Sequence, residues 1–273
     1  MMSAKPPVCL TIAGLDPSGG AGIIADIKTF SRFGCFATAA ISSLTFQNTT
    51  GVFGAVHQTA ASIRGQIQPV IDDFDVAAIK TGMLPTAETI QAVAALVRRN
   101  QLRNLVVDPV VRSTSGFDLI DESALTSLIE TLFPLATLVT PNLPEAERIT
   151  GIAILSEEDI EPAARLMQSM GVQNVLIKGG HALGKQEVKQ QSEPKVRKAK
   201  DFLFVGDDVH VFEADLIETT STHGTGCTLS AAIAANLALG KDLIVSVRVS
   251  KEFVTEAIRT APVLVNGASP INI

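Results

Sequence analysis

The 273-residue sequence contains no tryptophan and no tyrosine, so phenylalanine supplies all of its ring-stacking aromatic side chains apart from four histidines. A surface that binds nucleic acid by stacking bases would have to rest on these residues alone, which is unfavourable. The formal net charge of −6 also argues against nucleic acid or an anionic membrane as the main partner. The composition therefore favours small-molecule partners, with no nucleic acid and no membrane.

Cysteine is scarce as well, with an odd count of three at widely spaced positions, Cys9, Cys35 and Cys227. This spacing offers neither a disulfide framework nor a CxxC zinc pair, so we expect free thiols in a reducing compartment. The sequence lacks an apolar run of the roughly 18 residues that a membrane span needs. Residues 1–7 lack the charged-then-apolar pattern of a signal peptide. We expect a cytoplasmic protein.

Short β-branched runs alternate with amphipathic segments along most of the chain. This alternation predicts an α/β fold with a central, mostly parallel sheet flanked by helices, and we expect one domain over residues 1–273. The predicted strands are 8–13, 36–44, 52–57, 76–80, 105–107, 137–140 and 174–178. The predicted helices are 22–33, 59–71, 86–99, 122–132, 144–150, 156–170 and a stretch from Ser230.

One segment departs from this alternation. Residues 181–200 are polar and include six Lys or Arg, and a hairpin signal follows at 202–205 and 209–212. We interpret residues 181–213 as a surface insertion with a hairpin, and the alternative is a mobile flap over a site.

A glycine-rich turn, Thr222–Ser230, runs directly into a small apolar helix. The backbone N–H groups of Gly224, Thr225 and Gly226 would form an anion site at the helix start, as phosphoryl transfer requires. Cys227 lies where that anion would bind. It is either a buried structural thiol or a general base whose pKa the helix start lowers. His223 either assists it or is a turn residue.

A second glycine-rich loop, Ala13–Gly22, permits close backbone approach to a ligand. It is not a Walker loop, because no Gly-Lys-Ser/Thr follows, and it is not a clean GxGxxG motif. Asp26, one turn into the next helix, either bonds the amine of a heterocycle or occupies a favourable first-turn position.

Polar side chains follow the predicted strands at their carboxyl ends, where open parallel sheets bind ligands. Gln47 offers the donor and acceptor that suit the edge of a heteroaromatic ring, or it caps a turn. Asp108 and Glu145 are either hard oxygen ligands for Mg²⁺, held through water, or solvated loop acids. Lys178 suits a phosphate. The complete set at strand ends is Asp16, Gln47, Lys80, Asp108, Asn142, Glu145 and Lys178.

Several motifs occur together in one order along the chain. They are Thr11–Gly22, Ala25–Thr29, Gln47–Thr49, Lys80–Leu84, Asp108–Val110, Thr140–Ala146, Leu176–His181 and His223–Ala231. In these motifs the sequence resembles the bacterial hydroxymethylpyrimidine and phosphomethylpyrimidine kinases of thiamine biosynthesis, and the resemblance covers nearly the whole chain.

The resemblance implies a ribokinase-like fold with a small β flap. It also implies phosphorylation, with ATP and Mg²⁺, of 4-amino-5-hydroxymethyl-2-methylpyrimidine and of its monophosphate by a homodimer. Carried over to this sequence, Asp26 and Gln47 would hold the ring, with backbone near Gly14 and Met83. The remaining roles are Asp108 and Glu145 for the metal, Asn142, Lys178 and Thr225 for ATP, and Gly224, Thr225, Gly226 and Cys227 for the anion hole, with Cys227 as base.

The sequence also departs from the family pattern. Many pyridoxal kinases of the wider superfamily have aspartate where Cys227 stands, so the cysteine favours the pyrimidine branch. A pyridoxal kinase and a non-catalytic pyrimidine-binding regulator remain the alternatives. Residues 111–116 differ from the sequence that the family commonly has at this position. The insertion after His181 is longer than is usual in the family. Phe46 replaces a smaller residue, and strand alternation predicts that it points away from Gln47.

Overall fold

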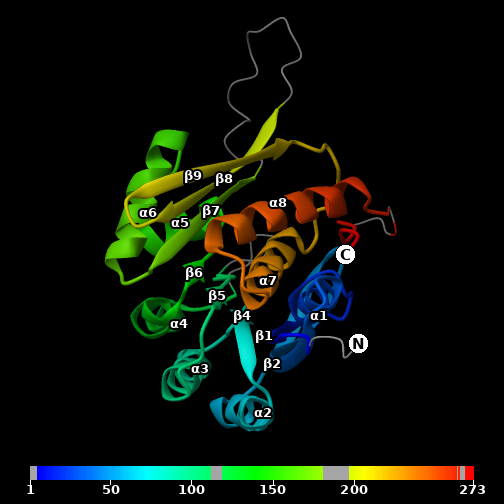
Figure 1. The fold of residues 1–273 in the computed structure, drawn as a ribbon, viewed down its shortest axis with the longest axis vertical. Helices are drawn as coiled ribbons and strands as arrows, with labels where there is room; N and C mark the ends of the chain where they lie inside the picture. Colours follow the sequence, from blue (N-terminus) through cyan, green and yellow to red (C-terminus); the bar gives the residue numbers. More distant parts are fainter. Residues whose placement is uncertain (1–4, 112–118, 181–196, 263, 265–267) are drawn as a thin grey trace, which may run out of the picture.

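The computed structural model describes residues 5–111, 119–180, 197–262, 264 and 268–273 (Figure 1). Within these residues a single nine-stranded sheet runs through the molecule in the order β3-β2-β1-β4-β5-β6-β7-β8-β9. Its strands are β1 Val8–Leu15, β2 Phe36–Asn48, β3 Gly51–His57, β4 Val76–Thr81, β5 Leu105–Val107, β6 Leu138–Val139, β7 Asn174–Gly180, β8 Lys198–Val205 and β9 Asp208–Asp215.

Six neighbouring strands, in the order β2-β1-β4-β5-β6-β7, are parallel. Antiparallel strands extend the sheet at both edges, β3 at one and β8 and β9 at the other. Strands that are covered on both faces need apolar side chains on both, which explains the continuous Leu105–Val107 run, where every residue is fully buried. The parallel arrangement brings the carboxyl ends of β1, β4, β5, β6 and β7 to the same edge of the sheet.

Helices cover both faces of the sheet. Three of them, α1 Gly22–Arg32, α7 Thr225–Ala238 and α8 Leu243–Arg259, lie together on the face that is toward the viewer in Figure 1. Helix α7 lies between α1, α8 and the sheet, so small residues surround its axis on all sides. The other face carries α2 Ala60–Asp73, α3 Ala87–Arg99, α4 Glu122–Ser127, α5 Leu143–Thr150 and α6 Ile160–Ser169.

The structure confirms the mostly parallel α/β sheet and each predicted strand and helix, with shifted ends. The predicted helix over 122–132 continues from α4 as a π-helical turn, Leu128–Leu132, followed by a 3₁₀ turn, Phe133–Leu135. The start of the predicted 156–170 helix is a 3₁₀ turn, Glu157–Asp159. No assignment had been made for α8, whose β-branched residues are also typical of strands.

The predicted hairpin at 202–212 is present as β8 and β9, and both strands belong to the central sheet, with β8 paired to β7. Residues 181–196 of the expected insertion and residues 112–118 of the divergent stretch lie outside the described residues. None of the helices in the described part of the chain combines the length and apolar character that crossing a membrane requires.

Candidate active site

A cavity of about 1560 Å³ opens at the carboxyl edge of the sheet. Sites for one small ligand usually measure roughly 300–1,000 Å³, so this cavity has room for two ligands side by side. Both glycine-rich loops, the β2–β3 hairpin, the start of α5, and parts of β8, β9 and α8 line it. The predicted site residues among its lining are Gly14, Gln47, Met83, Asp108, Asn142, Glu145, Lys178, Gly224, Thr225, Gly226 and Cys227.

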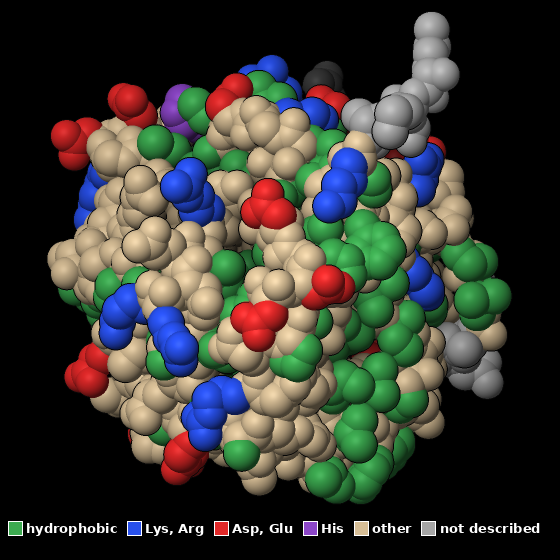
Figure 2. All heavy atoms as spheres, turned by 60° about the horizontal axis from the view of Figure 1, so that its bottom comes forward, with side chains coloured by type: hydrophobic (Ala, Val, Ile, Leu, Met, Phe, Trp, Pro, Cys, Tyr) green, Lys and Arg blue, Asp and Glu red, His purple; other side chains and the backbone are tan. Residues whose placement is uncertain are grey.

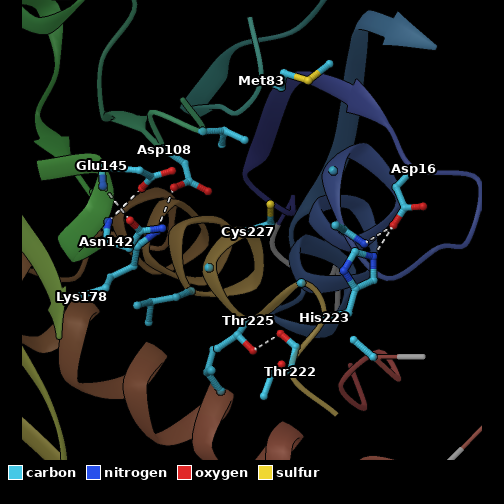
Figure 3. Close-up of a pocket in the computed structure, with 18 of the residues that line it drawn as sticks. Asp16, Met83, Asp108, Asn142, Glu145, Lys178, Thr222, His223, Thr225 and Cys227 are labelled. Carbon is cyan, nitrogen blue, oxygen red and sulfur yellow. Dashed lines mark hydrogen bonds and ion pairs between the residues drawn. The ribbon is translucent and has the colours of Figure 1, made fainter. Parts of the chain in front are cut away.

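A charged group forms one side of the cavity. Lys178, at the end of β7, places its Nζ 2.9 Å from Oδ1 of Asp108, which follows β5 (Figure 3). Asn142 and Glu145 form a capping box at the start of α5, with two reciprocal hydrogen bonds of 2.8 Å. This capping box fixes the Glu145 side chain beside the Lys178–Asp108 pair.

The charged side chains in this group shift one another's pKa values. Burial alone would lower the pKa of Lys178, but the neighbouring carboxylates of Asp108 and Glu145 raise it above its ordinary value, so the ammonium stays charged. Burial raises the pKa of Glu145 to about 7, against the attraction of Lys178. A cation at this position would favour the charged carboxylate.

Asp108 and Glu145 supply carboxylate oxygens that suit Mg²⁺ in chemical type. Among the described residues, however, no three His, Cys, Asp or Glu side chains converge as a metal cage. Mg²⁺ commonly takes only one or two protein carboxylates and completes its shell with water and substrate phosphates, so these two residues fit that mode. The metal would then depend on the nucleotide for its remaining ligands.

An open helix N-terminus faces this charged group. Gly224 is the N-cap of α7 with φ of 86°, and no side chain caps the first turn. A Cβ added at Gly226 would lie 3.1 Å from Nζ of Lys178. Glycine at 226 therefore lets the ammonium approach the helix start, where an anion would meet both the backbone donors and a positive charge.

Cys227 follows in the first turn of α7, and it lies between the charged group and the first glycine-rich loop in Figure 3. The sequence predicted that the helix start lowers its pKa, and this was wrong in direction. Burial raises the pKa of the Cys227 thiol to about 11, although the charge of Lys80 and a hydrogen bond from the Gly22 N–H oppose the rise. Dehydration of the thiolate outweighs the helix start, so the unliganded protein holds a neutral thiol.

Asp26 is not part of the cavity lining. It lies beneath the cavity as one half of a fully buried ion pair, with Oδ2 at 2.9 Å from Nζ of Lys80 and within hydrogen-bond distance of Thr11 Oγ1. Its other oxygen has no hydrogen-bond partner within the described residues. Asp26 therefore holds Lys80 in place, and its carboxylate keeps the pKa of Lys80 above the ordinary value despite burial.

Asp16 lines the opposite side of the cavity and binds several donors. Its Oδ1 accepts from the backbone N–H and the hydroxyl of Ser18, and its Oδ2 accepts from the Ala21 N–H at 2.9 Å. His223 Nε2 lies 2.7 Å from Oδ2, and the Gln47 side chain is a further group that lowers the pKa of this carboxyl. Burial would raise the pKa of Asp16, but these hydrogen bonds hold it well below its ordinary value. His223 is thus directed to Asp16, not to Cys227 (Figure 3).

Sequence reasoning missed the end of the cavity formed by α8. Val254 and Ile258 line it together with Leu216 and Ile217, the residues that follow β9. This apolar end suits a flat heterocyclic base. The four-residue spacing of Val254 and Ile258, which places both side chains on one face of a helix, was the sequence signal that could have revealed it. Phe46 does not line the cavity, whereas Gln47 does, which confirms that the two side chains point apart.

Val110 was also missed. It lines the cavity two residues after Asp108 and has φ of 44°, a left-handed conformation that a β-branched residue rarely adopts. Backbone strain of this kind concentrates at functional sites.

Residues 16–272 match the family described as phosphomethylpyrimidine kinase. The thiamine biosynthesis bifunctional protein ThiED of Geobacter sulfurreducens is 44% identical over 96% of the chain, which spans about half (51%) of that protein's length. A hydroxymethylpyrimidine/phosphomethylpyrimidine kinase of Haemophilus influenzae is 42% identical over 96% of this chain and 95% of its own. Among solved structures, an ADP complex of Bacillus subtilis pyridoxal kinase is 34% identical, with a TM-score of 0.86 over 98% of both chains.

The buried Asp26–Lys80 pair generates a prediction for stability. Asp26→Leu should lower the free energy of unfolding by about 3–5 kcal/mol, because it leaves the ammonium of Lys80 buried without a counter-charge. Lys80→Met should cost a similar amount. The double variant should be more stable than either single variant. Urea unfolding measures all three, and additive losses in the double variant would contradict the pairing.

The raised pKa of Cys227 predicts slow alkylation at neutral pH. A pKa of about 11 means that the thiol form dominates below that pH, so reaction with iodoacetamide should accelerate about tenfold per pH unit from 7 to 10. Mass spectrometry of the peptide that carries Cys227 gives the rate, and the buried Cys9 and Cys35 serve as internal references. A plateau near pH 8 would show that the thiol ionises as readily as a free cysteine.

Proposed function

Because the chain belongs to the phosphomethylpyrimidine kinase family, we propose that it transfers the γ-phosphate of ATP to the hydroxymethyl group of 4-amino-5-hydroxymethyl-2-methylpyrimidine. It then phosphorylates the monophosphate, and both steps serve thiamine biosynthesis. The observation that carries this proposal is the position of Cys227. It lies in the first turn of an uncapped helix, with Lys178 over that helix start and Gln47 across the same cavity.

The pyrimidine binds at the end of the cavity formed by β1, β2 and the residues after β4. Gln47 bonds the edge of the ring, and backbone at Gly14 and the side chain of Met83 form its walls. A Cβ at Gly14 would lie 3.1 Å from the Met83 methyl carbon, so glycine at 14 leaves the ring space beside Met83. Asp26 contributes indirectly, by holding Lys80 beneath the pocket.

The nucleotide occupies the other end. Val254 and Ile258 contact the base, and the phosphates extend toward Asn142, Lys178 and Thr225. The transferring phosphoryl group lies against the N–H groups of the Gly224–Cys227 turn, with the ammonium of Lys178 beside it. Donors that are fixed before the reaction stabilise the developing charge without reorganising. Mg²⁺, held by Asp108 and Glu145, neutralises phosphate charge when it is bound.

Cys227 receives the proton of the substrate hydroxyl as that oxygen attacks phosphorus. Its thiol is neutral in the unliganded protein, so it must first release its proton to solvent as the ligands bind, and the thiolate then accepts the hydroxyl proton. Lys80 and the Gly22 N–H already favour the thiolate. These two groups are therefore the local sources of its activation.

A pyridoxal kinase is the second candidate. Its support is the overall similarity of this chain to the Bacillus subtilis pyridoxal kinase. The aminopyrimidine is favoured because Gln47 offers both a donor and an acceptor to the ring edge. A pyrimidine-binding regulator without catalysis is disfavoured, because Cys227, Asp108 and Lys178 together serve transfer and not binding alone.

We further propose that the chain acts as one catalytic unit in the cytoplasm, where its three free thiols stay reduced. On the face seen in Figure 2, basic and acidic side chains are interspersed, so this face presents no continuous basic stripe for nucleic acid. Hydrophobic side chains gather along one side of the same face.

The substrate assignment is tested by ATP consumption with Mg²⁺, given hydroxymethylpyrimidine, its monophosphate or pyridoxal in parallel. We expect turnover with both pyrimidines and little with pyridoxal. A preference for pyridoxal would keep the fold and the transfer chemistry and reject the pyrimidine assignment. Absence of turnover with all three would favour the binding protein.

The matched control is Cys227→Ala, which we expect to lower kcat about 10²- to 10⁴-fold, since a general base contributes in this range. Pyrimidine affinity, measured by calorimetry, should stay nearly unchanged. An unaltered kcat would remove the thiol from the mechanism.

A homodimer is also part of the proposal. The β2–β3 hairpin exposes Leu44, Phe46, Phe53 and Val56, and Phe53 is 72% exposed. A second copy of the chain would cover this apolar surface, which monomers seldom expose. We expect light scattering to give twice the chain mass for the wild type and a single chain mass for Phe53→Asp. A monomeric wild type would refute the dimer.

A further inference from the structure

Asp16 lies in the cavity wall opposite the Lys178–Asp108 pair and contacts both glycine-rich turns, through the Ala21 N–H and through His223. We propose that Asp16 and His223 are positioning residues. They hold the first glycine-rich loop and the Gly224–Cys227 turn in the relative position that phosphoryl transfer requires. This proposal rests on the proposed function in one respect, namely that the reaction is phosphoryl transfer to a bound alcohol. The contacts that support it do not depend on the identity of that alcohol.

Asp16 has no capacity left for a ligand. A carboxylate has about four lone-pair sites, and here four donors occupy them, the Ser18 N–H and hydroxyl, the Ala21 N–H and the His223 ring. It is almost fully buried at 2% exposure. Its position in the cavity wall therefore serves the protein's own loops, and neither a metal ion nor a substrate can bind it without displacing one of these donors.

The two loops are also in direct backbone contact. A Cβ added at Gly224 would lie 1.7 Å from the carbonyl oxygen of Gly20, and one added at Gly20 would lie 2.3 Å from the His223 ring. The Gly22 N–H is among the groups that favour the thiolate of Cys227, which places the first loop beside this sulfur. Only glycines allow this approach, and the Asp16–His223 contact of 2.7 Å lies beside it. A shift of His223 would therefore move the anion-binding turn relative to Cys227 and the first loop.

His223 is held from its other side as well. Its N–H donates to the carbonyl of Ser269 at 3.3 Å, and its own carbonyl accepts from the Ile271 N–H at 3.4 Å. His223 thus joins two parts of the chain, since its backbone is bonded to residues 269–271 and its ring to Asp16. Its Nε2 is occupied by Asp16, which leaves that nitrogen no role as a base for the substrate.

Asp16 links His223 to ring recognition through Gln47. Asp16 and Gln47 both line the cavity, and the Gln47 amide is one of the groups that lower the pKa of Asp16, so the side chain that reads the ring and the turn that binds phosphate both neighbour this carboxylate. The three residues consequently have distinguishable expected effects. His223 acts on transfer, Gln47 acts on ring binding, and Asp16 acts on both.

The test is steady-state kinetics and calorimetry on His223→Leu, His223→Gln, Asp16→Asn and Gln47→Ala. Misplacing reacting groups by about 1 Å costs on the order of 100-fold, so His223→Leu should lower kcat about 10- to 100-fold with unchanged affinity for the acceptor. His223→Gln keeps a donor at nearly the same reach and should recover most of that loss. Asp16→Asn should lower both kcat and acceptor affinity, and Gln47→Ala mainly affinity.

A double variant and a stability control separate positioning from general damage. His223→Leu combined with Asp16→Asn should lower kcat no further than the worse single variant, because both remove the same link. Met167→Ala, on the buried face of α6 and not among the residues that line the cavity, should lower the melting temperature with kcat unchanged. Multiplicative losses in the double variant, or full kcat in His223→Leu, would overturn the proposal.

The acceptor used is whichever alcohol the wild type phosphorylates, so a failed pyrimidine assignment leaves the test intact. If no acceptor is turned over, iodoacetamide alkylation of Cys227 gives the result instead. His223→Leu should speed that reaction at least about fivefold, because the turn that shields the sulfur loses its hydrogen bond to Asp16. An equal alkylation rate in wild type and His223→Leu would refute the positioning role without reference to activity.

Discussion

The active site depends on one constraint, the close packing of two glycine-rich turns that come from opposite ends of the chain. Gly20 and Gly224 meet at a backbone distance that no side chain could share. This contact is possible because parallel strands bring the loops after β1 and before α7 to one edge of the sheet. With the turns fixed, the amide groups at the start of α7, Cys227 and the wall formed by Gly14 acquire definite positions. The remaining groups of the site are arranged around them.

Charge in the site is compensated pair by pair. Lys178 is held by Asp108, and Lys80 is held by Asp26 one layer deeper. Both lysines remain positive despite burial because each has a carboxylate within hydrogen-bond distance. The ammonium of Lys178 lies beside the start of α7, where we propose that phosphate binds, and that of Lys80 lies near the thiol. This division lets a cavity that is lined by acids receive a polyanion, since each acid near the path is already engaged with a cation or poised to bind one.

The sequence predicted the sheet and the residues at strand ends well, because both follow from local patterns. Asp108 comes directly after β5 and Lys178 lies near the end of β7, and the parallel topology brings such positions together. Asp26 was harder to interpret, because its partner Lys80 is 54 residues away and nothing near it in sequence marks the pair. The error on Cys227 has the same origin. A helix start is visible in the sequence, whereas the depth at which the sulfur is buried depends on the packing of α1 against α7. Helix α8 escaped assignment because Val245, Val247 and Val249 favour a strand until the tertiary packing of α7 overrides that preference.

The 207-residue separation between Asp16 and His223 has a consequence for the order in which the molecule is made. During synthesis the first loop emerges early, yet its carboxylate has no imidazole partner until residue 223 has left the ribosome. The backbone hydrogen bonds of His223 form later still, because they need Ser269 and Ile271. The strand pairings from β1 to β7 need no later residue, but α7 covers one face of these strands, so the core of the sheet also needs residues 225–238. The catalytic edge therefore cannot be complete in a nascent chain that lacks Asp16, His223 or residues 269–271.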